Sequence, residues 1–272
     1  MALMHINFYS QTLHMDTAIS VIMPQAMQGI GLAGSSFQKE YPVLWLLHGR
    51  SDDHTIWMRR TSIERYTAPL GIMVIMPEVS YSRYMNMVHG PSYYDFVSEE
   101  LPNFCGKLFP KMSRKREYNY IAGLSMGGGG AMWIGLHNPQ KYSRICMLST
   151  GGVAPLEHLW RVAGSDTNYR NLNEDIYGTS DSDSLEGTEY DILKLIQDTA
   201  ATHRELPSVY HAMGTEDIRY PVAMKIKRTF EAIPGNPYHY EYHEGPGTHE
   251  WVFWDTWIKC FLHTLSGKEE NP

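Results

Sequence analysis

The sequence predicts an α/β fold with a mostly parallel central sheet and helices on both of its faces. Two short, nearly continuous apolar runs, at 43–47 and 72–76, are typical of strands that are buried on both sides. After them, strand patterns alternate with helical patterns as far as a last helix expected at 250–265. No internal repeat or long low-complexity linker divides the chain, so one domain over residues 1–272 is expected.

The remaining elements follow from periodicity and turn residues. Alternation and β-branched content predict strands at 17–24, 118–122, 144–149, 208–213 and 238–243. Helical spacing predicts helices at 93–109, although Pro102 interrupts it, and at 129–138 and 221–233. The polar stretch at about 152–205 breaks this rhythm. We expect it to be a cap-like excursion over the carboxyl edge of the sheet, where it would shape an active site.

Composition excludes several classes of partner. The chain has 272 residues, 43% of them hydrophobic, which is enough to bury a large core. A net charge of -7 argues against nucleic acid and anionic membranes, which bind to positive surfaces. No apolar run is long enough to span a bilayer, and the first residues do not resemble a signal peptide. Three scattered cysteines indicate reduced core thiols, so a cytoplasmic location is expected.

Two glycine patterns suggest different chemistry. The letters GIGLAG (Gly29, Gly31 and Gly34) match a dinucleotide-binding fingerprint, which must open a helix in order to hold a pyrophosphate. Here the glycines lead into a predicted strand, so a plain loop is the better interpretation. The letters GLSMG instead place Ser125 between a predicted strand and a predicted helix. That order is the strand–turn–helix of a nucleophile elbow, which lifts a serine hydroxyl above the sheet.

A serine nucleophile needs a base and an acid, because its hydroxyl reacts poorly at neutral pH. In hydrolases with this elbow, an acid and then a histidine follow the serine, each just after a strand. The letters GTED after the strand at 208–213 offer Glu216 or Asp217, and spacing leaves the choice open. The loop after the strand at 238–243 offers His249 as the base.

Two backbone groups are expected to bind the oxyanion that forms when the serine attacks a carbonyl. One is the N–H of Met126, directly after the serine, and the other is the N–H of Arg50, after the strand at 43–47. Tyr81, Arg83 and Tyr84 are expected to help shape the substrate pocket.

A metal site is the alternative interpretation of the histidine-rich strand. His239, Glu241 and His243 would share one face of a strand at 238–243. None of the usual zinc signatures is present, so no metal is expected. A non-catalytic binding module is a further alternative, but binding alone does not require a nucleophile, an acid and a base together.

Taken together, the motifs resemble a known family. LLHG, YYDF, YIAGLSMGG, GTED and GTHEW are similar to the tributyrin esterase branch of the esterase D group of α/β-hydrolases, which includes S-formylglutathione hydrolases. The resemblance implies an α/β-hydrolase fold and cofactor-free hydrolysis of short-chain acyl esters, sometimes of acetyl groups on sugars. It assigns the acid to Asp217 and implies a dimer or tetramer. Hydrolysis of S-formylglutathione, or of feruloyl or cinnamoyl esters, is an alternative activity within the same fold.

Overall fold

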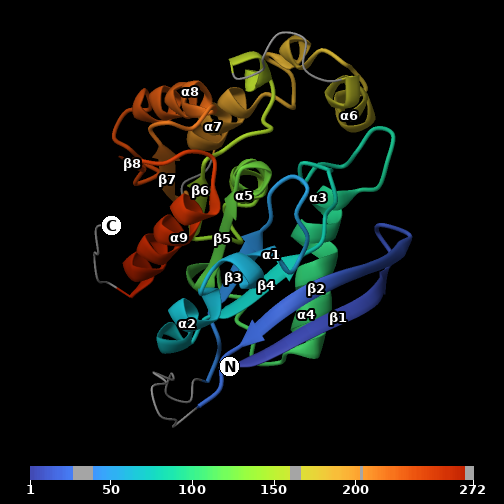
Figure 1. Ribbon diagram of the computed structural model, residues 1–272, viewed down its shortest axis with the longest axis vertical. Coiled ribbons are helices and arrows are strands. Elements are labelled where there is room, and N and C mark those ends of the chain that lie inside the picture. Colours follow the sequence, from blue (N-terminus) through green and yellow to red (C-terminus); the bar gives the residue numbers. More distant parts are fainter. Residues whose placement is uncertain (27–38, 160–166, 203–204, 267–272) are drawn as a thin grey trace.

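A computed structural model describes residues 1–26, 39–159, 167–202 and 205–266 of the chain. Its centre is one sheet of eight strands in the order β1-β2-β4-β3-β5-β6-β7-β8 (Figure 1). The strands are β1 (Ala2–Ser10), β2 (Met15–Met23), β3 (Val43–Leu47), β4 (Met73–Pro77), β5 (Asn119–Leu124), β6 (Arg144–Leu148), β7 (Ser208–Gly214) and β8 (Glu241–Gly245). The GIGLAG glycines lie outside the described residues.

The sheet is mostly parallel, as the sequence predicts. Only the β1–β2 and β2–β4 pairs are antiparallel, while β4, β3, β5, β6, β7 and β8 pair in parallel. Parallel strands all end at one edge, so the loops after β3, β5, β7 and β8 meet on the same side of the molecule. These are the loops in which the sequence places the oxyanion donors, the serine, the acid and the base.

Helices cover both faces of the sheet. They are α1 (Ile56–Arg60), α2 (Ile63–Thr67), α3 (Tyr93–Asp95), α4 (Leu101–Leu108), α5 (Met126–His137), α6 (Thr167–Tyr177), α7 (Ile192–Thr202), α8 (Tyr220–Glu231) and α9 (Trp251–Leu265). Alternate residues of a central strand point to opposite faces. In β3, Trp45 joins the core beneath α4, α5 and α8, whereas Leu46 joins the core beneath α1, α2 and α9. The continuous apolar runs in the sequence reflect these two cores.

The helix broken by Pro102 contains a wide turn. A π-helical turn at Phe96–Glu100 separates α3 from α4. Proline has no N–H to donate to the carbonyl of residue 98, four positions earlier. The ammonium of Lys141 donates to that Ser98 carbonyl instead, at 2.9 Å. The helical rhythm of the sequence therefore survives the proline, because a side chain from elsewhere replaces the lost donor.

The polar segment between β6 and β7 has two parts. Its first part carries α6, which Figure 1 places at the top of the molecule, away from the sheet. Its last part is α7, which buries Ile192 and Ile196 and packs against α5 and α8. The prediction of an excursion over 152–205 is thus too long at its carboxyl end, because the apolar face of α7 belongs to the main helical layer.

The last strand begins later than predicted. Tyr238 and Tyr240 are buried but precede β8, and His239 between them has a left-handed φ of 42°. The side chain of Asn236 accepts the Tyr240 N–H at 2.7 Å, which closes a turn where the alternating pattern predicts a strand. Among the described residues, no helix is both long enough and apolar enough to cross a membrane.

Candidate active site

Ser125 lies at a sharp, strained turn between β5 and α5. Its φ of 51° is in the left-handed region that residues other than glycine rarely adopt. Three backbone hydrogen bonds hold it there: its N–H donates to Leu148, and its carbonyl accepts from Gly129 and Gly151, at 2.8 to 3.1 Å. The strain is therefore supported from β6 and α5, and the hydroxyl is fixed at the carboxyl edge of the sheet.

Close backbone approach explains the glycines on either side of the serine. A Cβ atom on Gly123 would lie 2.3 Å from the carbonyl oxygen of Gly127. One on Gly127 would lie 2.5 Å from the carbonyl oxygen of Leu47 in β3. Neither contact is possible for a side chain, so the elbow can form only with glycine at both positions.

A chain of hydrogen bonds joins Ser125, His249 and Asp217. The Nε2 atom of His249 lies 2.9 Å from the Oγ atom of Ser125, and its Nδ1 atom lies 2.7 Å from Oδ2 of Asp217. The second carboxylate oxygen of Asp217 accepts the backbone N–H of Arg219 at 2.8 Å. The structure thus brings together the three side chains that the sequence singles out, from the ends of β5, β7 and β8.

Burial and charge set the protonation of this chain. Burial lowers the pKa of His249, the hydrogen bond to Asp217 opposes that shift, and the positive charge of Arg219 adds to it. Burial works to raise the pKa of Asp217, but the hydrogen bond and charge of His249, joined by the hydrogen bond from the Arg219 N–H, leave that pKa lowered. An ionised Asp217 beside a neutral His249 is the arrangement that lets the imidazole accept a proton.

The neighbouring Glu216 has a different environment. Its carboxylate is exposed, and it accepts the backbone N–H of Gly247 at 2.6 Å. It therefore braces the loop that carries His249, whereas Asp217 makes the contact with the imidazole itself.

The two expected oxyanion donors belong to the start of α5 and to the loop after β3. Met126 is the first residue of α5, where a backbone N–H has no acceptor within the helix. Arg50 lies in the loop after β3. Its neighbour Gly49 lies close to Ser125, since a Cβ atom added to Gly49 would be 3.7 Å from Cβ of Ser125. The positive end of α5 adds favourable potential for a developing negative charge.

A cavity of about 660 Å³ opens over the serine and histidine. Its lining residues come from the end of β5, the loops after β3, β4, β7 and β8, and the start of α9: Gly49, Arg50, Ser51, Asp52, Tyr81, Leu124, Ser125, Arg219, His249, Glu250, Trp251 and Trp254. Arg219 and Trp254 are not among the site residues that the sequence predicts, although Arg219 closely follows Asp217 and Trp254 closely follows His249 in the chain. None of the described residues of 152–205 lines this cavity.

Arg83 and Tyr84 do not line the cavity, which corrects their assignment to the substrate pocket. The Arg83 side chain is 3% exposed and forms an ion pair with Glu157, a carboxylate with no exposed surface. Tyr84 is completely buried, and its hydroxyl donates to the carbonyl of His48 at 2.9 Å. The partners that bury these two residues are distant in sequence or belong to the backbone, so the local letters do not reveal them.

The histidines of the alternative metal site are separated. His243 lies on β8 and stacks on Tyr210, with ring centroids 4.3 Å apart. His239 precedes the strand and lines a different cavity. Within the described part of the chain, no three His, Cys, Asp or Glu side chains converge as a metal site would require.

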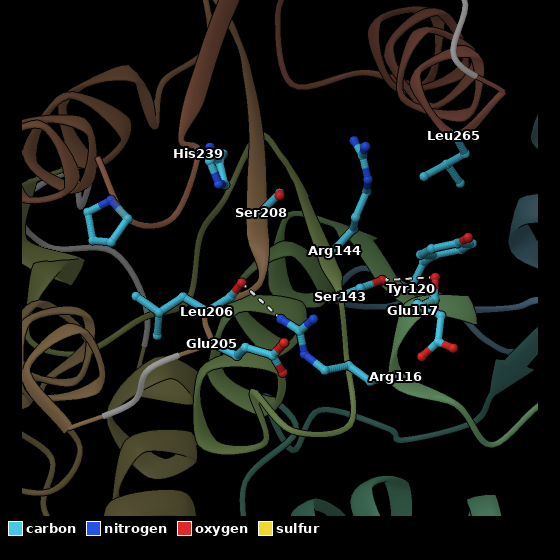
Figure 2. A pocket seen from close by; sticks show the side chains of 11 residues that line it. Arg116, Glu117, Tyr120, Ser143, Arg144, Glu205, Leu206, Ser208, His239 and Leu265 are labelled. Atoms are coloured by element: carbon cyan, nitrogen blue, oxygen red, sulfur yellow. Dashed lines mark hydrogen bonds between the residues drawn. The ribbon is translucent and has the colours of Figure 1, made fainter. Parts of the chain in front are cut away.

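That different cavity, of about 510 Å³, lies at the starts of β5, β6 and β7, the opposite edge of the sheet from Ser125. Figure 2 shows Arg116, Arg144 and His239 around it. Arg116 donates to the carbonyls of Pro139 and Leu206, and Arg144 donates to the hydroxyl of Thr264. These cations thus hold protein acceptors together, and the cavity contains no member of the Ser125 hydrogen-bond chain.

Fold and site together define a serine hydrolase class, in which a nucleophile elbow, an acid and a histidine follow successive parallel strands. Comparison with known proteins agrees. Residues 10–263 match the family described as "Putative esterase". The acetyl esterase of Caldicellulosiruptor saccharolyticus is 29% identical over 278 residues, which cover 98% of both chains.

Solved structures give the same class. The fluorophosphonate-binding serine hydrolase F of Staphylococcus aureus is 32% identical, with a TM-score of 0.82 over 97% of this chain and 98% of that one. An S-formylglutathione hydrolase of Staphylococcus aureus is also 32% identical, with a TM-score of 0.80 over the same shares. The chain belongs to this esterase family. It has the α/β-hydrolase fold and is a carboxylic ester hydrolase, as the sequence predicts.

Proposed function

We propose that the protein hydrolyses short-chain acyl esters through an acyl-enzyme on Ser125. The observation that carries this proposal is the continuous hydrogen-bond chain from Ser125 through His249 to Asp217, at 2.9 and 2.7 Å. The similarity to an acetyl esterase supports a short acyl group, and acetyl groups on sugars are natural candidates.

The reaction would proceed in two halves. Oγ of Ser125 attacks the ester carbonyl carbon while Nε2 of His249 takes the serine proton. The N–H groups of Arg50 and Met126 stabilise the oxyanion, and Asp217 stabilises the imidazolium. The tetrahedral intermediate then collapses, and the alcohol leaves with the proton from His249. Water attacks the acyl-enzyme by the same route, and the carboxylic acid is released.

The decisive experiment is Ser125→Ala, assayed with p-nitrophenyl acetate. We expect a loss of at least about 10³-fold in kcat, because removing the nucleophile of a triad costs nearly as much as removing all three members. The variant should fold normally, since the backbone hydrogen bonds of residue 125 do not involve its hydroxyl. Turnover close to that of the unsubstituted enzyme would overturn the proposal. Activity that resists a fluorophosphonate but falls with a chelator would favour a metal-dependent hydrolase.

A second candidate substrate is S-formylglutathione, a thioester that carries two carboxylates. Two arginines, Arg50 and Arg219, line the cavity beside the serine and could pair with those carboxylates. The similarity to an S-formylglutathione hydrolase supports this candidate. Parallel assays with acetyl, butyryl and octanoyl esters, a feruloyl ester and S-formylglutathione would rank the substrates by kcat/KM.

The remaining expectations concern the context of the enzyme. We propose that residues 1–272 fold as one domain, since all eight strands belong to one sheet. The buried free thiols of Cys105, Cys146 and Cys260 support a reducing compartment such as the cytoplasm. The family resemblance favours a dimer or tetramer acting on a small-molecule ester. Size-exclusion chromatography with light scattering would measure the oligomeric state.

A further inference from the structure

The imidazole of His48 lies directly behind the loop that carries the Arg50 N–H. The side chain is 1% exposed and sits at the end of β3. Its Nε2 atom accepts the backbone N–H of Val79 at 3.1 Å. Its Nδ1 atom lies 2.7 Å from the carbonyl oxygen of Gly49.

Only one form of the ring can make both contacts. A carbonyl oxygen only accepts, so Nδ1 must donate to Gly49, and a backbone N–H only donates, so Nε2 must accept from Val79. The ring is therefore neutral, with its proton on Nδ1. Glu78 does not compete for Nε2, because its Oε1 atom is 3.9 Å away and accepts the Ser80 N–H at 2.9 Å.

The Gly49 carbonyl and the Arg50 N–H are opposite ends of one peptide group. That group is planar, so fixing the direction of the carbonyl fixes the direction of the N–H. The Asp52 N–H also donates to the Gly49 carbonyl, at 3.3 Å, but this longer bond comes from the loop itself. The shorter bond, from His48, anchors the peptide plane to the buried end of β3.

Tyr84 connects the same loop to the other expected oxyanion donor. Its hydroxyl donates to the His48 carbonyl at 2.9 Å. Its ring occupies the space beside Gly130, where an added Cβ would lie 2.3 Å from a ring atom. Gly130 belongs to α5, whose first residue is Met126. Tyr84 therefore ties the loop of Arg50 to the helix of Met126.

We propose that His48 is a positioning residue that aims the Arg50 N–H at the oxyanion, with Tyr84 as its support. This inference rests on the proposed function, since it presupposes acyl transfer at Ser125. It gives a role to a buried polar side chain that touches neither Ser125 nor any reacting atom. A misdirected donor would weaken the binding of the transition state more than the binding of the ground-state ester.

Two substitutions separate the two hydrogen bonds of the ring. His48→Asn keeps a donor at the position of Nδ1 and removes the acceptor for Val79. His48→Gln keeps an acceptor at the position of Nε2 and removes the donor to Gly49. Both variants replace the buried imidazole by an amide, so we expect them to lose similar amounts of folding stability and to serve as controls for each other.

We expect kcat to fall by at least about tenfold in His48→Gln, since complete loss of an oxyanion donor costs about 10²–10³. KM should change little, and His48→Asn should retain most of kcat. The affinity for a boronic acid, which forms a tetrahedral adduct with serine, should fall in parallel with kcat. Melting temperatures and active-site titration with a fluorophosphonate give the folded fraction of each variant.

Equal losses of kcat in the two His48 variants, or losses that follow the melting temperature, would overturn the inference. If His48→Gln does not fold, Tyr84→Phe serves instead, because it removes only the hydroxyl and keeps the ring beside Gly130. Its boronic acid affinity should fall, and an unchanged affinity would be evidence against the positioning role. Ser125→Ala serves as the reference. If Ser125→Ala keeps its activity, the proposed function is wrong. If Ser125→Ala is inactive, the results for the His48 and Tyr84 variants test the positioning role of His48 alone.

Discussion

His249 and Asp217 are joined by a hydrogen bond of 2.7 Å between Nδ1 and a carboxylate that has no exposed surface. The bond fixes which nitrogen of the imidazole faces Ser125, because Nδ1 must carry a proton to donate. Asp217 thus determines both the orientation and the tautomer of the base.

The first prediction compares the two neighbouring acids. Asp217→Asn should lower kcat by about 10³–10⁴-fold, because an amide can donate to Nδ1 and so stabilise the wrong tautomer. Glu216→Gln should change kcat only a few-fold, since the amide oxygen can still accept the Gly247 N–H. Steady-state kinetics with p-nitrophenyl acetate measures both. The reverse order would assign the acid to Glu216.

The second prediction concerns the acidic limb of the pH profile. His249 must be neutral to accept the serine proton, so kcat/KM falls as the pH drops below the pKa of His249. Burial lowers that pKa first, and the positive charge of Arg219 lowers it further. Arg219→Gln should therefore raise the pKa and move the acidic limb to higher pH.

The profile of kcat/KM against pH, recorded at constant ionic strength for the enzyme, for Arg219→Gln and for a control variant, tests this shift. Arg228→Gln, at an exposed position further along α8, is the control and should leave the limb in place. A limb that stays fixed in Arg219→Gln, or moves to lower pH, would contradict the assigned influence of Arg219.

The third prediction concerns the buried ion pair between Arg83 and Glu157. Arg83→Met removes the ion-pair partner of a carboxylate that has no exposed surface and that also accepts a hydrogen bond from Asn173, at 3.1 Å. We expect a loss of about 3–5 kcal/mol in the free energy of unfolding, which is typical for breaking one half of such a pair. Adding Glu157→Leu should recover much of that loss, because the buried carboxylate is then removed as well.

Urea denaturation of the two single variants and the double variant measures this coupling. The exposed pair of Lys194 and Asp198 on α7 is the comparison. Lys194→Met should change the stability by no more than about 0.5 kcal/mol, as surface pairs do. A double variant as unstable as Arg83→Met would mean that packing, and not charge, dominates at this site.

The sequence predicts most of the sheet, because the buried strands have strong local patterns. The run at 43–47 is β3 as predicted, and the strand–turn–helix around Ser125 is in place. The strand at 238–243 is misplaced, because Asn236 closes a turn that alternation alone does not reveal. Local pattern cannot distinguish a buried tyrosine in a strand from one beside a turn.

The site is predicted in part. Ser125 and His249 follow from chain order, since parallel strands bring their carboxyl ends together. Chain order leaves Glu216 and Asp217 as equal candidates for the acid, and only the family resemblance assigns Asp217. The burial of Arg83 and Tyr84 away from the cavity cannot be predicted from the sequence. Glu157 is 74 positions from Arg83, and the partner of Tyr84 is a backbone carbonyl. The role inferred for His48 cannot be predicted from the sequence either, since it depends on the directions in which its two ring nitrogens point.

The four consecutive glycines after Ser125 have a practical consequence for anyone who alters this enzyme. Replacing glycine by alanine inside a helix is a common route to greater stability, because it reduces the freedom of the unfolded chain. Here that route is closed at two of the four positions. At Gly127 the new methyl group would meet the backbone of β3, and at Gly130 it would meet the ring of Tyr84. These two positions therefore exclude even a methyl group, although a run of glycines looks permissive in the sequence, and a search for a more stable variant should begin elsewhere.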